Sequence, residues 1–262
     1  MLTGEQIRKA RQAKEMTQAA LAAELGVSSE AVSKWEKNGY SPSPENEEQL
    51  YRILGLSRLG KRREDVVIFD ERNMSAFLKG KFNSGNFPEA SRALTFAKEK
   101  HEGQLRKPEE LKIPYINHPL TLACHAMAMG LEEDGLLAAL LLHDVCEDCG
   151  VAPEELPVST EVQQVVALVT KPKPFLNEKL YYSEIAKNPR AAMVKCLDRC
   201  NNLSGMAAAF SVEGLQDYID ETERYYPELL RVIKEQPEYN NAAWLLKYQI
   251  RSLLLTAKRI TV

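Results

Sequence analysis

Apolar residues recur along most of this chain at the spacing of an α-helix, and the two-residue alternation of a β-strand is rare. After residue 87 the pattern predicts a series of helices, over residues 90–101, 120–129, 135–146, 161–170, 180–187, 191–208, 212–233 and 241–257. Most prolines lie in the segments that connect these ranges, where they do not interrupt a helix. We therefore predict an all-α fold, with the larger domain over residues 87–262.

The first 56 residues predict shorter helices with turn signals between them. Two of these helices, over residues 18–25 and 30–37, each follow a capping residue: Thr17 for the first, and Ser28 or Ser29 for the second. Gly26 lies between them in a tight turn. Two short helices joined in this way form a helix-turn-helix, whose second helix can enter the major groove of DNA. We place this small domain at residues 1–58.

Residues 59–86 predict a linker between the two domains. A polar, basic run covers residues 57–63, and residues 66–69 could form a short strand or an anchor between domains. Residues 79–86 are rich in turn-forming types. The basic run could add contacts to phosphate groups, although such runs are more often simply solvated.

Charge is distributed unevenly over the 262 residues. The chain has 34 Lys and Arg residues against 37 Asp and Glu residues, which gives a net charge of -3. Residues 1–63 hold 11 basic and 8 acidic residues, so 23 and 29 remain for the rest of the chain. A basic small domain joined to an acidic larger one suits a head that faces nucleic acid.

Nothing in the sequence predicts a membrane segment or a disulfide framework. The opening residues contain no apolar signal segment, and no window of the chain approaches the length of a membrane span. The five cysteines are an odd number in a chain long enough to bury a large core. We therefore expect a reduced, cytoplasmic protein that does not contact a membrane.

The strongest chemical signal is a group of ionisable residues that follows the apolar run 136–142. It comprises His143, Asp144, Glu147 and Asp148. At about 3.6 residues per helical turn, His143 and Glu147 fall on one face, and so do Asp144 and Asp148. Such groups are costly to bury unless a positive charge neutralises them, and a divalent metal ion supplies that charge. The alternative is a polar cap at the end of the helix.

Two further residues at helix ends, His118 and Asp198, extend this group. Together with His143 and Asp144 they form a mixed set of nitrogen and oxygen donors, which suits Mn²⁺, Fe²⁺ or Zn²⁺ and leaves positions for water and substrate. Glu147 lies one turn beyond His143, where it could take a proton from water at the metal.

The cysteines allow another interpretation of the same region. Cys146 and Cys149 have C-x-x-C spacing, and Cys196 and Cys200 could form the other half of a zinc site. We favour the simpler interpretation that Cys196 and Cys200 pack as small apolar side chains.

Residues 16–56, MTQAALAAELGVSSEAVSKWEKNGYSPSPENEEQLYRILGL, resemble the XRE (Cro/C1-type) helix-turn-helix family. The resemblance implies a set of DNA contacts, with Gln18 and Ser28 near phosphates and Ser29, Glu30, Ser33 and Lys34 facing base edges. Trp35 would lie in the core. Glu30 departs from the Gln or Arg that the family often has, and an acid repels phosphate. The alternative is a head that mediates only protein contacts. Because one small head makes few base contacts, sequence-specific DNA binding would need a homodimer.

Three segments of the larger domain, FAKEKHEGQLRKPEELKIPYINHPLTLA, AALLLHDVCEDCG and VKCLDRCNNL, resemble the RelA/SpoT-type HD hydrolase domain, which also occurs alone in small alarmone hydrolases. The resemblance covers roughly residues 87–230 and implies a larger HD-type helical hydrolase domain. Four residues would bind Mn²⁺ or another divalent metal: His118, His143, Asp144 and Asp198. We expect no counterpart of the nucleotide synthetase domain that occurs in this family.

The same resemblance implies the reaction and the residues that carry it. The substrate would be guanosine tetra- or pentaphosphate, from which the 3′-pyrophosphate is removed. Glu147 and Asp148 would activate and orient water, and Arg106, Lys107 and Asn202 would bind the nucleotide. Two alternatives follow from a departure in the segment Asn201–Ser204, in which Ser204 stands in place of the family's usual arginine. The chain could be a transcription regulator that senses a nucleotide with little turnover, or a phosphohydrolase of another nucleotide such as NADPH.

Overall fold

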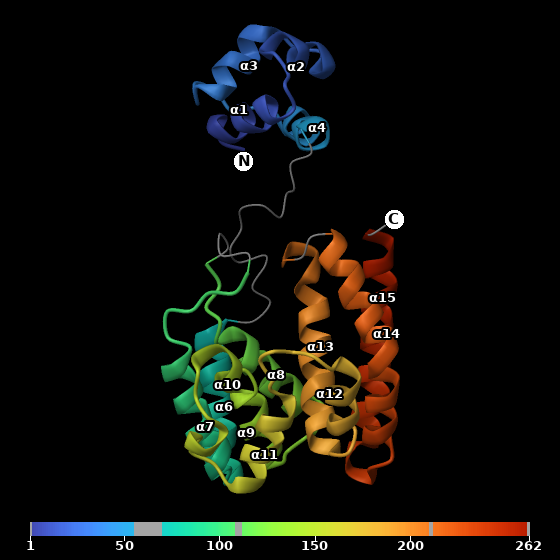
Figure 1. The fold of residues 1–262 in the computed structure, drawn as a ribbon. Coiled ribbons are helices and arrows are strands. Elements are labelled where there is room, and N and C mark those ends of the chain that lie inside the picture. Colours follow the sequence, from blue (N-terminus) through green and yellow to red (C-terminus); the bar gives the residue numbers. More distant parts are fainter. Residues whose placement is uncertain (1, 55–69, 108–111, 210–211, 261–262) are drawn as a thin grey trace. The chain divides into compact units, whose positions relative to one another are not determined.

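The structure, a computed structural model, describes residues 2–54, 70–107, 112–209 and 212–260. Over these ranges the chain is helical, with a single isolated β-bridge between Leu105 and Pro114, which confirms the expected all-α class. The chain divides into two compact units, Met1–Ile68 and Phe69–Val262, and each has its own hydrophobic core (Figure 1). No helix in the described ranges is long and apolar enough to span a membrane.

The first unit contains four helices in its described part, α1 (Gly4–Ala13), α2 (Gln18–Leu25), α3 (Ser29–Glu36) and α4 (Pro44–Leu54). The hydroxyls of Thr17 and Ser28 accept hydrogen bonds from the backbone N–H groups of the first turns of α2 and α3. Gly26 adopts the left-handed conformation, with φ of 67°. The predicted helix-turn-helix is therefore confirmed, with Ser28 rather than Ser29 as the cap. Trp35 lies in the core, as expected.

The second unit carries the remaining helices: α6 (Glu71–Gly85), α7 (Pro88–Lys100), α8 (Asn117–Ala128), α9 (Asp134–Leu142), α10 (Val145–Cys149), η3 (Pro153–Glu155), α11 (Thr160–Val169), α12 (Glu178–Ile185), α13 (Pro189–Ala209), α14 (Val212–Lys234), η4 (Pro237–Tyr239) and α15 (Asn240–Ile260). Helix α9 is fully buried from Leu136 to Leu142 and packs against α7, α8 and α11. Helices α13, α14 and α15 lie side by side, and α13 also contacts α8 and α9 (Figure 1).

The predicted linker is wrong for its C-terminal half. Residues 71–85, which include most of the turn-rich segment, form helix α6, and only Asn86 leaves the helix in the left-handed conformation. Met74, Leu78 and Phe82 recur every four residues and are buried in the core of the second unit. Burial of this apolar stripe outweighs the low helix propensity of the glycines and asparagines around it. The basic run and the segment 66–69 lie outside the described residues.

The predicted helix over residues 135–146 is also wrong, because it is two helices. Helix α9 ends at Leu142 and α10 begins at Val145, so His143 and Asp144 occupy the junction. A helix end leaves carbonyl groups without intrahelical partners, and the imidazole Nδ1 of His143 lies 2.9 Å from the carbonyl oxygen of Leu140. The junction thus places two polar side chains at the end of a buried apolar helix.

Candidate metal and substrate site

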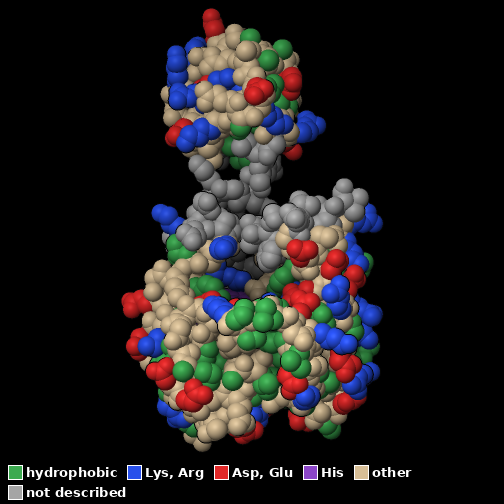
Figure 2. Space-filling view, viewed as in Figure 1, with side chains coloured by type: hydrophobic (Ala, Val, Ile, Leu, Met, Phe, Trp, Pro, Cys, Tyr) green, Lys and Arg blue, Asp and Glu red, His purple; other side chains and the backbone are tan. Residues whose placement is uncertain are grey.

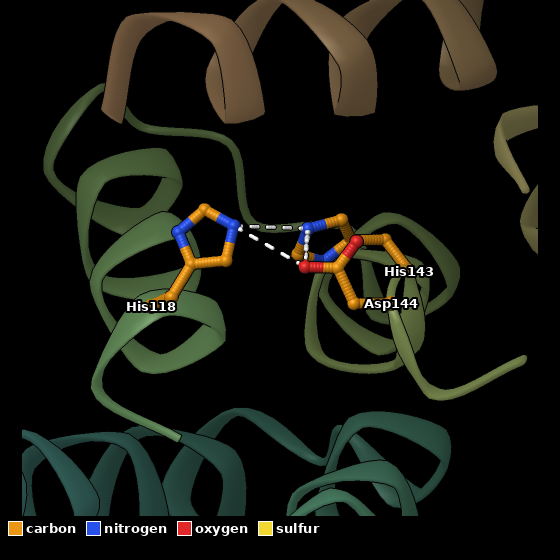
Figure 3. A group of neighbouring side chains, drawn as sticks. All are labelled: His118, His143 and Asp144. Atoms are coloured by element: carbon orange, nitrogen blue, oxygen red, sulfur yellow. Dashed lines mark hydrogen bonds and ion pairs between the residues drawn. The ribbon is translucent and has the colours of Figure 1, made fainter. Parts of the chain in front are cut away.

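Three parts of the second unit bring the predicted metal ligands together. His118 is the second residue of α8, His143 and Asp144 lie between α9 and α10, and Asp198 lies within α13. The ligand atoms of His118, His143 and Asp144 all lie within 4.8 Å of one another (Figure 3). Asp198 lies beside this group, with its Oδ1 3.2 Å from Nε2 of His118 and 3.8 Å from Nε2 of His143.

The hydrogen bonds of the two imidazoles fix which nitrogen faces the cluster. Nδ1 of His118 lies 2.7 Å from the side-chain oxygen of Asn201, and Nδ1 of His143 lies 2.9 Å from the backbone oxygen of Leu140. Because carbonyl oxygens only accept hydrogen bonds, both Nδ1 atoms carry the proton. In the neutral rings both Nε2 atoms then present lone pairs, and they face each other at 3.2 Å. Two such lone pairs need a cation between them.

The separations of the ligand atoms fit a shared metal ion. The Oδ2 atom of Asp144 lies 3.0 Å from Nε2 of His143 and 3.4 Å from Nε2 of His118. Two ligand atoms bound at about 2.1 Å from one ion, at right-angled or tetrahedral positions, lie roughly 3.0–3.4 Å apart. The donor set and its spacing therefore fit a divalent transition metal, and both histidine side chains are almost completely buried.

The electrostatics of the cluster agree with a cation site. Burial alone raises the pKa of Asp144, but the two imidazoles hold that pKa well below its usual range. Burial lowers the pKa of His143, yet the carboxylates of Asp144 and Asp198 outweigh burial and raise it to about 9. Without a metal ion, a proton is therefore the cation that this site attracts.

Two side chains that the sequence analysis did not select hold the carboxylates. The Tyr115 hydroxyl donates to Oδ2 of Asp144 at 2.6 Å, the oxygen that faces the imidazoles. The buried ammonium of Lys195 donates to Oδ2 of Asp198 at 3.3 Å. Lys195 precedes Asp198 by three residues on one helix, a spacing that could have indicated the pair. No comparable signal in the sequence links Tyr115 to Asp144.

The predicted catalytic carboxylates lie on the short helix α10. The Oε2 atom of Glu147 accepts from the backbone N–H of Lys171 at 3.2 Å, and the Glu147 carbonyl accepts from the Lys173 ammonium at 3.1 Å. Asp148 is exposed, and its charge helps to raise the pKa of Tyr115, after burial and Asp144. Asp148 therefore lies close to the cluster, whereas the side chain of Glu147 is hydrogen-bonded to the segment that follows α11.

Two of the three predicted substrate residues, Arg106 and Asn202, contact each other beside the predicted metal ligands. The Arg106 guanidinium donates to the side-chain oxygens of Asn201 at 2.9 Å and Asn202 at 2.7 Å. The backbone N–H of Arg106 donates to the carbonyl of Ile113 at 2.9 Å, beside the isolated β-bridge. Lys107 follows on the surface and is exposed. Asn201, which is not among the predicted substrate residues, contacts Arg106 as well.

The cysteines are not part of the cluster of predicted metal ligands. All five are free thiols, and Cys196 and Cys200 are buried in the core of the second unit. Within the described part of the chain, the group with metal-binding geometry contains imidazole and carboxylate donors without a cysteine. The packing role expected for Cys196 and Cys200 agrees with their burial.

In the first unit, the residues expected to contact DNA lie on α2, α3 and the turn between them. Ser28, Ser29, Glu30 and Lys34 are exposed, and Ser33 is half-buried. Gln18 is also half-buried, and its amide donates to Glu36 at 2.8 Å, which leaves a second amide hydrogen for a phosphate. Figure 2 shows Lys and Arg side chains on both sides of this unit in the view drawn.

Comparison with known proteins gives relatives for both parts of the chain. A helix-turn-helix family model matches residues 7–59. A guanosine-3′,5′-bis(diphosphate) 3′-pyrophosphohydrolase of Aquifex aeolicus is 37% identical over 128 residues, which are 44% of this chain but only 17% of that protein. The Xenopus tropicalis guanosine-3′,5′-bis(diphosphate) 3′-pyrophosphohydrolase MESH1 is 35% identical over 137 residues, which are 48% of this chain and 76% of that protein. A solved structure described as a metazoan ortholog of SpoT that hydrolyses ppGpp aligns with a TM-score of 0.49 and 23% identity, over 64% of this chain and 94% of its own.

Proposed function

We propose, since this chain belongs to the family of guanosine-3′,5′-bis(diphosphate) 3′-pyrophosphohydrolases that includes MESH1, that it hydrolyses guanosine tetra- or pentaphosphate at a divalent metal site. The observation that carries the proposal is the cluster of His118, His143, Asp144 and Asp198. Its two imidazoles present lone pairs to each other at 3.2 Å, with a carboxylate oxygen 3.0 Å from one of them. Buried lone pairs that face each other beside a carboxylate are unfavourable unless a cation lies between them.

We propose Mn²⁺ as the ion, held by these four residues, because the donors are imidazole nitrogens and carboxylate oxygens. When bound, such an ion lowers the pKa of water and offsets negative charge on phosphate oxygens. Tyr115 and Lys195 complement it by fixing Asp144 and Asp198 through hydrogen bonds.

The remaining residues of the site would bind the nucleotide and move protons. Arg106 and Lys107 supply positive charge for the phosphates, and Asn202 supplies amide groups for the ribose or the bridging region. During hydrolysis the water oxygen bonds to the phosphorus next to the 3′ oxygen, and the bond between that phosphorus and the 3′ oxygen breaks. The proton lost by water passes to Glu147 or Asp148, and the 3′ oxygen gains a proton. The products are pyrophosphate and GDP or GTP.

Release of pyrophosphate from ppGpp by the purified chain tests this proposal. We expect release that requires an added divalent ion, that chelation abolishes, and that exceeds any turnover of NADPH measured in parallel. Phosphate release from NADPH without pyrophosphate release from ppGpp would instead favour the other phosphohydrolase.

One observation favours a second candidate function, a regulator that binds the nucleotide with little turnover. Ser204 stands where the family usually has an arginine, and its hydroxyl donates to the backbone oxygen of Asn201 at 2.6 Å. The chain thus lacks the arginine that could contact a phosphate, and Ser204 forms a bond within α13 instead. Saturable binding of ppGpp without pyrophosphate release, in the presence of Mn²⁺, would support this function.

We also propose that the first unit binds DNA as part of a homodimer. Support comes from the helix-turn-helix match and from the exposure of Ser29, Glu30 and Lys34 on α3. Gln18 and Ser28 would contact phosphates, with Ser33 at the base edges. Fluorescence anisotropy of a labelled duplex at several salt concentrations, beside sedimentation of the free protein, tests this. Absence of binding at low salt would contradict it, and a monomer that binds tightly would contradict the dimer.

The five free cysteines are consistent with a reducing, cytoplasmic location, which we also propose.

A further inference from the structure

The metal ligands are connected to Arg106 by a chain of hydrogen bonds. The guanidinium donates through one terminal nitrogen to Oδ1 of Asn201 and through the other to Oδ1 of Asn202, at 2.9 and 2.7 Å. Each asparagine in turn contacts a different ligand. Oδ1 of Asn201 also faces Nδ1 of His118 at 2.7 Å, and Nδ2 of Asn202 donates to Oδ1 of Asp198 at 2.6 Å.

Chemistry fixes the direction of both branches. Oδ1 of Asn201 lies between two donors, so turning this amide over would place its NH₂ group against both of them. Turning the amide of Asn202 over would place NH₂ against the guanidinium and an oxygen against the carboxylate of Asp198. The positive charge of Arg106 therefore orients both amides, and each amide presents the group that its ligand requires.

The consequence for the ligands is specific. With its Nδ1 proton directed to Asn201, His118 keeps the lone pair of Nε2 toward the cluster. The bond from Asn202 reaches Oδ1 of Asp198, which is the oxygen nearest to His118, at 3.2 Å. Lys195 holds the other oxygen of Asp198. Both oxygens of the Asp198 carboxylate are thus held by hydrogen bonds.

We propose that Arg106 is a positioning residue of the metal centre in addition to its expected contact with the nucleotide. Through Asn201 it fixes His118, and through Asn202 it fixes Asp198. This inference rests on the metal site of the proposed function, but it concerns binding of the ion before any nucleotide is present. Asn201 carries one of the two branches and belongs to the segment in which this chain departs from its family.

Binding of Mn²⁺ to the purified full-length chain, without nucleotide, tests the inference. Free Mn²⁺ is measured by electron paramagnetic resonance during a titration of the metal-stripped protein. We expect Arg106→Ala to raise the Kd for Mn²⁺ by about 10- to 100-fold, as loss of groups that orient metal ligands does. The matched control is Lys107→Ala, which removes the neighbouring exposed charge and should leave the Kd unchanged or lower it.

The sign of the change separates positioning from simple electrostatics. Removal of a positive charge near a cation site favours cation binding, so a purely electrostatic or substrate role predicts an unchanged or lower Kd for Arg106→Ala. That result would overturn the inference.

A second pair of variants tests the branch through Asn201 even if Arg106→Ala does not fold. Asn201→Asp keeps an oxygen that accepts from both His118 and Arg106, and it should bind Mn²⁺ at least as tightly as the parent chain. Asn201→Leu removes the acceptor and should weaken binding by about tenfold or more. Equal affinities for the two variants would overturn the inference. Because no turnover is measured, failure of ppGpp hydrolysis would leave these results unaffected.

Discussion

Two groups of largely buried charged side chains in this molecule differ in how their charges are neutralised. In the first unit, the carboxylate of Glu36 accepts from the Arg11 guanidinium at 2.6 and 3.1 Å, so one anion meets one cation through two bonds. In the second unit, the carboxylates of Asp144 and Asp198 surround two imidazoles whose facing nitrogens lack protons in the neutral state. The first group is complete within the chain. In the second, Lys195 pairs with Asp198 only, so the carboxylate of Asp144 and the two facing lone pairs require an added cation.

The difference separates a buried ion pair that stabilises the fold from a buried group that binds an ion. A matched bidentate pair such as Arg11 with Glu36 connects α1 to α3 and needs nothing from solution. An arrangement of anions and lone pairs that remains unmatched, at ligand spacing, is instead typical of a binding site.

His143→Ala should abolish the function of the unmatched group. The variant lacks one ligand, so Mn²⁺ affinity and pyrophosphate release from ppGpp should fall together, the latter by at least about 10³-fold. Both are measured on the purified chain. As a control, His125→Ala removes a histidine of α8 that lies outside the cluster, and this variant should keep both properties. Full activity in His143→Ala would show that the cluster is not the reaction centre.

Glu147→Gln should separate metal binding from turnover. The variant keeps the size of the side chain but removes its ability to take a proton, so turnover should fall by about 10²-fold or more while Mn²⁺ affinity stays the same. Steady-state kinetics and a metal titration measure the two properties, and Glu154→Gln on the surface provides the control. If Glu147→Gln were fully active, Asp148 would be the remaining carboxylate for this role.

Arg11→Met should destabilise the first unit and leave the metal site unchanged. The substitution leaves the Glu36 carboxylate buried without its cation, which costs about 3 kcal/mol in similar cases. Trp35 is 7% exposed in this unit and Trp244 is 67% exposed in the other, so urea unfolding followed by fluorescence in a Trp244→Phe background reports on the first unit. The prediction fails if the free energy of unfolding is unchanged, or if Mn²⁺ affinity falls as well.

The first unit should also lose stability in acid, by less than in Arg11→Met. Burial alone would raise the pKa of Glu36, but the hydrogen bonds from Arg11 and Gln18 hold it below its usual value of 4.5. A lowered folded-state pKa contributes stability that is present above about 4.5 and is lost as the pH falls through the folded-state value. The same fluorescence assay at several pH values measures this loss. The unfolding free energy should depend less on pH in Glu36→Gln than in the parent chain. An identical dependence on pH would refute the assignment to Glu36.

Lys34→Ala should have the smallest effect, because the side chain is exposed and makes no buried ion pair of the Arg11 kind. We expect DNA affinity to fall by about 1 kcal/mol, or roughly fivefold, with unchanged unfolding free energy. Fluorescence anisotropy at constant salt measures the affinity. Lys37→Ala, one residue past the end of α3, serves as the comparison. Equal loss in both variants would indicate general electrostatic attraction rather than a contact by α3.

Much of the fold and part of the site followed from the sequence. The cap residues Thr17 and Ser28 act within one helical turn, so local pattern was enough to locate α2 and α3. The break at His143 and the helix α6 were not predictable in this way, because both depend on contacts across the folded chain. Met74 and Phe82 stabilise α6 only by packing on a core formed by later residues.

In the candidate site, the proposed ligands could be predicted from the sequence, but the residues that orient them could not. His118 and Asp198 were selected because they occur in recognisable motifs, although 80 residues separate their numbers. Tyr115 lies three residues before His118, yet nothing in the sequence indicates that its hydroxyl reaches Asp144. The bonds of Asn201 to both His118 and Arg106 likewise depend on the crossing of α8, α13 and the segment before α8. Motifs indicate the proposed ligands, whereas the residues that orient them emerge only from the packing of helices.

The most direct test of the central claim is the stoichiometry of divalent metal binding. The purified chain is stripped with a chelator and titrated with Mn²⁺, beside His143→Ala. The account predicts saturation at one ion per chain in the parent and loss of that binding in the variant, with pyrophosphate release from ppGpp returning only as the parent is loaded. Pyrophosphate release by the stripped parent, or equal Mn²⁺ binding in both chains, would contradict it.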